Sequence, residues 1–131
     1  MASWEEVQGF IEKELSAKKK GDDCWGATFS VTDGRTQVVL FFKKIEKTTN
    51  TVWLDIQSPV GKIESIEVLD KALSFLAGLH CGGLIKVGDV YAVRHGVPID
   101  DLSSDEIKNP LLSVCISADV LENKLVGGDN W

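Results

Sequence analysis

Apolar residues recur every three or four positions near the start of the chain, and this spacing predicts an amphipathic helix. Ser3 and Glu6 stand at the spacing of a capping box, in which each side chain accepts a hydrogen bond from the other residue's amide. The lysine run 18–20 with Gly21 predicts the end of the helix, because cations and glycine are both favourable there. The surrounding acidic residues favour this interpretation of the run over a nucleic-acid patch. The apolar positions are Trp4, Val7, Ile11 and Leu15.

Strands are predicted where aromatic and β-branched residues replace the helical spacing. Segments 25–32 and 36–44 flank Asp33-Gly34, a two-residue signal for a type I′ hairpin. The run 38–42 is apolar without alternation, which predicts a central strand covered on both faces. Further strands are expected at 51–58, 84–87 and 90–97, and Gly88-Asp89 predicts a tight turn between the last two.

Two more helices complete the pattern. Apolar residues at helical spacing predict a helix over 66–79, capped by Ser65 and stopped near Gly82-Gly83. A long terminal helix begins at Ser103, and Pro110 should either kink it or restart it with Asn109 as cap.

The order of predicted elements is α-β-β-β-α-β-β-α, with hairpin connections and no alternating βαβ units. This order predicts an α+β fold with an antiparallel sheet and helices packed on it. The length of 131 residues suits a single domain over 1–131. We expect its core to span about 3–126, followed by a flexible tail over 127–131.

The terminal helix carries more apolar residues than one buried face needs. Leu112, Ile116 and Val120 form a second apolar stripe, roughly half a turn from the first. This stripe requires a cover, either the first helix or a second molecule, and the sequence favours neither. Trp53, on the polar side of strand 51–58, is either packed under a loop or part of a contact surface. The stripe spaced for the core comprises Ile107, Leu111, Val114, Ala118, Leu121 and Leu125.

Charge and composition exclude several classes of function. The net charge of −6 argues against nucleic-acid or anionic-membrane partners. No apolar run is long enough to span a bilayer, and the first twenty residues lack the pattern of a signal peptide. Three cysteines without a CxxC motif favour a reduced, cytoplasmic setting.

No constellation of residues predicts catalysis or a cofactor. Phosphate-binding glycine motifs and zinc-ligand spacings are absent from the sequence, and the acidic cluster at 100–106 lacks the spacing of a calcium loop. Cys81 beside His80 lacks the separation typical of a nucleophile and its base, so a packed thiol is the expected role. We therefore expect no enzyme activity, no metal and no cofactor.

Three stretches carry a resemblance to a known family. They are residues 53–59 (WLDIQSP), residues 83–87 (GLIKV) leading into 93–98 (VRHGVP), and the apolar helix after Asp101-Leu102. Together with the element order, they resemble the type III secretion chaperone-like fold, and within it the YbjN-type domain family. The resemblance implies a small, acidic, non-enzymatic protein that is often dimeric.

These observations predict a chaperone-like or regulatory module that binds protein. Leu112, Ile116, Val120 and Trp53 are the predicted partner-binding residues, and the partner is a client peptide or a second subunit in a homodimer. The alternative is a small-molecule sensor or an unrecognised enzyme that uses the sheet face near Trp53 and His95.

Overall fold

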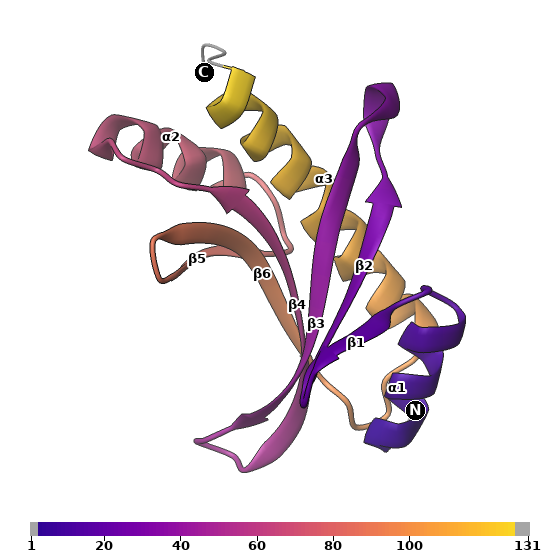
Figure 1. Ribbon diagram of the computed structural model, residues 1–131. Coiled ribbons are helices and arrows are strands. Elements are labelled where there is room, and N and C mark those ends of the chain that lie inside the picture. Colours follow the sequence, from indigo (N-terminus) through magenta and orange to yellow (C-terminus); the bar gives the residue numbers. More distant parts are fainter. Residues whose placement is uncertain (1–2, 128–131) are drawn as a thin grey trace.

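The computed structural model describes residues 3–127 and shows an α+β fold, a six-stranded antiparallel sheet with three helices (Figure 1). The helices are α1 (Trp4–Lys13), α2 (Ile66–Ala77) and α3 (Ser104–Gly127). The strands are β1 (Lys18–Gly21), β2 (Cys24–Ser30), β3 (Thr36–Glu46), β4 (Thr51–Gly61), β5 (Gly83–Val87) and β6 (Val90–Pro98). Their order across the sheet is β1-β2-β3-β4-β6-β5. The predicted flexible tail lies outside the described residues except for Gly127, which ends α3.

The lysine run forms a strand, so the prediction that it ends the first helix was wrong. Helix α1 ends at Lys13, and Ser16 then adopts a left-handed backbone with φ of 57°. The amide of Ala17 donates to the carbonyl of Ile11, which closes the helix end without any glycine. The lysines therefore lie on an edge strand, where their charge discourages pairing with other chains. The element order consequently gains one strand over the predicted one.

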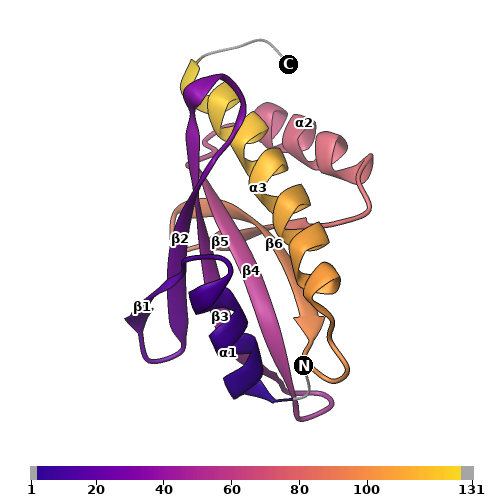
Figure 2. The same cartoon turned by 90° about the vertical axis from the view of Figure 1, so that its right-hand side faces the viewer.

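Helices α1 and α3 pack against one face of the sheet, and Figure 2 shows α3 along that side. Val39 and Phe41 of β3 point into this core, whereas Val38 points to the other face and is 45% exposed. The strand is central, as predicted, but it is covered on one face only. We call the side of Val38 the open face of the sheet. The buried core includes Val7, Ile11, Trp25, Phe41, Leu54, Ile56, Val93, Ile107, Val114 and Leu121.

The predicted caps of the helices are present, but the restart of the last helix at Asn109 and the end of the second helix near Gly82-Gly83 are not. Ser3, Ser65 and Ser103 each accept a hydrogen bond from the amide three residues later. Helix α3 passes through Pro110 and does not restart at Asn109. Helix α2 ends at Ala77 with Gly78 as its cap, so Gly82 and Gly83 do not terminate it.

The hairpin between β2 and β3 turns at Asp33-Gly34, as predicted. Asp33 has φ of 61° and Gly34 has φ of 74°, the positive values that a type I′ turn requires. The amide of Arg35 donates to the carbonyl of Thr32 and closes the turn.

Replacing Gly34 by valine is expected to lower the free energy of unfolding by about 1 kcal/mol or more, because a β-branched residue is strained at positive φ. A Cβ at this position meets no atom within 4 Å, so the loss would come from the backbone alone. Urea denaturation measures it, and an unchanged midpoint would contradict the prediction.

Candidate functional site

Helix α3 carries its two predicted stripes on different surfaces. The core stripe is buried against the sheet, with Ile107, Val114 and Leu121 completely inaccessible. Leu112 is 61% exposed and Ile116 is 48% exposed, so α1 does not cover the second stripe. Val120, the third member of the stripe, is half-buried. Within the described residues, Leu112 and Ile116 thus lack the intramolecular cover that one of the two interpretations required.

The exposed stripe borders a groove of about 600 Å³, which we call the α3 groove. One wall is the end of β2 and the turn that follows it, with Phe29 and Val31 facing inward. The other wall is α3, which contributes Leu111, Cys115 and Ile116 among others. The lining is chiefly apolar, and its size falls within the range of sites that bind a ligand or a few side chains.

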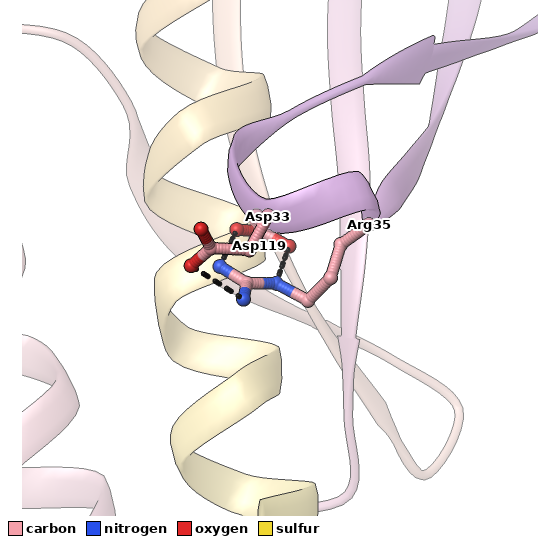
Figure 3. A network of polar contacts seen from close by, with 3 residues as sticks. All are labelled: Asp33, Arg35 and Asp119. Atoms are coloured by element: carbon pink, nitrogen blue, oxygen red, sulfur yellow. Dashed lines mark hydrogen bonds and ion pairs between the residues drawn. The ribbon is translucent and has the colours of Figure 1, made fainter.

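An ion pair ties the two walls together at one end of the groove (Figure 3). The guanidinium of Arg35 donates to both oxygens of Asp119, from Nε at 3.1 Å and from the terminal nitrogen at 2.8 Å. The Asp119 side chain is only 6% exposed, whereas the second partner of Arg35, Asp33, is open to solvent at 3.7 Å. The hydrogen bond to Asp119 raises the pKa of Arg35. Burial, assisted by the charge of Asp119, raises the pKa of Glu122.

The wall formed by β2 is also a partly unpaired sheet edge. Strand β1 pairs with β2 only over Cys24–Gly26, so the outer edge beyond that point has no neighbour among the described residues. The amide of Val31 donates to Arg35 and the amide of Lys43 donates to Asp23, which assigns the odd-numbered residues of this segment to pairing with β3. The amides and carbonyls of Thr28 and Ser30 therefore point outward.

A second apolar hollow lies on the other side of the exposed stripe, between α3 and α2. It has a volume of about 310 Å³ and is lined by Phe75 and Leu79 together with Leu112 and Ile116. The two exposed side chains of α3 thus form a ridge between two hollows. Helix α2 buries Ala72 and Leu76 and leaves Ile66 and Leu73 exposed, and Leu79 in the segment after the helix is exposed as well.

Trp53 and His95 lie on opposite faces of the sheet, which corrects the predicted shared site. Register pairs Ile56 with His95 and Asp55 with Gly96, so His95 points to the helices and Trp53 to the open face. The Nδ1 atom of His95 accepts a hydrogen bond from the amide of Gly82 at 3.2 Å. The indole of Trp53 donates to Thr51 at 2.9 Å and is half-buried.

The groove offers a surface for apolar contact rather than reactive groups. Cys115 lines it, and burial raises the pKa of this thiol, which keeps it protonated and a weak nucleophile. Over residues 3–127, no group of three or more potential metal ligands is present, and no helix is both long and apolar enough to cross a membrane.

Sequence reasoning found the stripe on α3 but missed the second wall of the groove. Arg35 follows a turn and Asp119 sits amid apolar residues of a helix, 84 positions later, so nothing in their spacing linked them. A charged residue within a strongly apolar helical segment was the available signal, because such a group requires a partner when buried.

No family model matches this chain, and no curated protein is significantly similar to it.

Proposed function

We propose that this protein binds an extended segment of another protein in the α3 groove, as a non-enzymatic chaperone-like or regulatory module. The observation that carries the proposal is the exposed stripe of Leu112 and Ile116 beside an apolar groove. Large apolar side chains grouped on a surface are typical of interaction sites. The resemblance of residues 53–59, 83–87 and 93–98 to the type III secretion chaperone-like fold supports the same function.

The proposed client pairs with the outer edge of β2 and lowers alternate side chains into the groove. Thr28 and Ser30 offer four backbone hydrogen-bonding groups at this edge. Burying an aliphatic side chain contributes about 1.5–3 kcal/mol, so two or three such side chains would supply most of the affinity. The occupant is thus a short extended peptide with apolar residues at alternate positions.

A homodimer is part of the proposal, and the apolar surface of α2 supports it. Ile66 and Leu73 are exposed on this helix, on a segment that contacts the rest of the fold mainly through Ala72 and Leu76. Because the three cysteines form no CxxC motif, we propose that the protein is cytoplasmic. The proposed partners include neither nucleic acid nor membrane.

Replacing Ile116 by glutamate is expected to abolish selection of peptides from a displayed random library, because the charge would lie between both hollows. The melting temperature should stay within a degree or two of wild type, since the side chain is half exposed in the folded protein. Ile45→Glu is the matched control, because Ile45 is 60% exposed at the far end of β3. Wild-type protein should enrich sequences with alternating apolar residues.

Two proline variants distinguish binding at the edge of β2 from binding at the edge of β5. Ser30→Pro removes an outward-pointing amide of β2, and Lys86→Pro removes one of β5. In β5, the two-residue turn at Gly88-Asp89 makes the backbone groups of Val87 pair with β6, so those of Lys86 point outward. Loss of binding in Ser30→Pro alone is the expected result. Loss in Lys86→Pro alone, or unaltered binding by Ile116→Glu, would contradict the proposed groove. Light scattering measures the molar mass of the same variants and reports whether a second copy of the protein contacts the ridge of Leu112 and Ile116.

A further inference from the structure

The open face of the sheet carries a ridge of apolar side chains that remains accessible to solvent. Val38, Leu40 and Phe42 alternate along β3 and form this ridge, which we call the β3 ridge. Val38 is 45% exposed, and the other two side chains are half-buried. Register places Leu40 between Gly26 of β2 and Gln57 of β4, so the ridge has no large apolar neighbour in that row. The apolar face of a sheet is normally buried against another layer of structure, and the β3 ridge is suited to such a cover.

A hollow bordered by two lysines lies on one side of the β3 ridge. It has a volume of about 330 Å³, with β2 as its floor and Lys18 and Lys20 of β1 along its outer side. Register pairs Lys18 with Gly26, so Lys18 points to the open face. A Cβ at Gly26 would lie 3.1 Å from Cε of Lys20 and 3.4 Å from Cδ2 of Leu40. The missing side chain therefore lets Lys20 lie across β2 toward the ridge.

Only positive charge borders this hollow. Lys18 and Lys20 are the charged residues that line it, and neither forms an ion pair within residues 3–127. The two aspartates of the turn after β1, residues 22–23, do not line it. Burial raises the pKa of the nearby Cys24 thiol, and the charges of Lys44 and Lys20 oppose this rise. Lys44 thus adds a third cation at this end of the open face.

An apolar hollow lies on the other side of the β3 ridge. It has a volume of about 200 Å³, Leu40 borders it as well, and no charged residue lines it. The acids that the strands place on the open face line neither hollow. Oδ1 of Asp55 lies 3.9 Å from Nε of Arg94, and Glu46 accepts a hydrogen bond from the hydroxyl of Thr48 at 2.7 Å. The ridge therefore separates a basic hollow from an apolar one.

We propose that the open face binds an acidic amphipathic helix of a partner protein. Its apolar stripe covers the β3 ridge and enters the apolar hollow, while carboxylates along one flank face Lys18 and Lys20. A helix suits this face because it presents one apolar stripe with charged residues beside it. Complementary charge selects an acidic partner, whereas the apolar ridge and the net charge of −6 disfavour nucleic acid. This inference does not rest on the α3 groove, which lies on the helix side of the sheet.

The probe is a fluorescein-labelled peptide of about 18 residues, with leucine at every third or fourth position and glutamate beside it. Fluorescence anisotropy should show saturable binding that weakens as salt is added. One control peptide carries lysine in place of every glutamate, and another has the composition of the probe in scrambled order. Each control should bind at least about tenfold more weakly than the probe.

Reversing the two lysines tests the charge match. The double variant Lys18→Glu, Lys20→Glu should weaken the acidic peptide by at least about tenfold, and it should bind the lysine peptide more tightly than wild type does. The matched control is Lys71→Glu, Lys86→Glu, which makes the same change of net charge at exposed lysines of α2 and β5. This control should bind the acidic peptide as wild type does. Leu40→Gln should also weaken the acidic peptide, because it removes apolar contact at the ridge.

The double variant should keep the wild-type melting temperature because Lys18 and Lys20 are exposed, so unfolding would not explain a loss of binding. Equal binding of either control peptide, or unaltered binding by the double variant, would overturn the proposal. So would loss of binding in Ile116→Glu, because the peptide would then lie in the α3 groove. Phosphatidylserine vesicles or duplex DNA that bind more tightly than the peptide, and only while both lysines are present, would assign the open face to a membrane or a nucleic acid instead.

Discussion

Replacing Arg35 by methionine is expected to lower the melting temperature by on the order of 5–10 °C, far more than a surface substitution does. The reason lies in its partner, because Asp119 of α3 would remain buried with its negative charge uncompensated. Removing one member of a buried ion pair is costly, whereas replacing both by apolar residues is often tolerated. Differential scanning calorimetry at neutral pH measures the loss.

Two further variants test this explanation. Arg35→Met combined with Asp119→Leu should recover most of the lost stability, because neither charge is then left buried alone. Asp33→Asn should change the melting temperature little, because the ion pair between Asp33 and Arg35 is exposed and long. A double variant no more stable than Arg35→Met would show that the arginine acts through packing instead.

Replacing Gly82 by alanine is also expected to have a large effect and to lower the free energy of unfolding by about 2–4 kcal/mol. Gly82 has φ of 89°, and a Cβ there would lie 2.9 Å from Cγ1 of Val93 in the core. Backbone strain and overpacking therefore act together. Urea denaturation followed by circular dichroism gives the value.

The neighbouring glycine is the matched control. A Cβ at Gly83 would meet no atom within 4 Å, and the backbone of Gly83 does not have a positive φ. Gly83→Ala should thus leave stability within about 0.5 kcal/mol of wild type. Equal losses at both positions would indicate that the turn before β5 is sensitive to any side chain.

Local patterns predicted the elements whose signals lie close together in the sequence. The Asp33-Gly34 turn, the serine caps and the core stripe of α3 all depend on residues a few positions apart, and all are present. The lysine run was misassigned because lysines after an amphipathic helix suit both a helix end and an edge strand. The left-handed conformation of Ser16 decides between the two, and such a conformation has no reliable sequence signal for serine.

Features that depend on sheet register were harder to foresee. Trp53 and His95 belong to neighbouring strands, and a shift of one residue determines whether they share a face. The apolar run in β3 suggested two covered faces because periodicity reports the polarity of a strand and not what lies above it. The two stripes of α3 could be told apart from the sequence because helical geometry fixes the angle between their residues, but the sequence left open what covers the second stripe.

The shortness of β1 has a kinetic consequence. This strand shields the edge of β2 only as far as Gly26, so an added strand would find two outward-facing residues, Thr28 and Ser30, to pair with. A complex held by so few backbone bonds would draw its affinity from side chains, and its residence time would be short. Release of the client would then need no energy source. The same client segment could pass from one copy of the protein to another as fast as it dissociates.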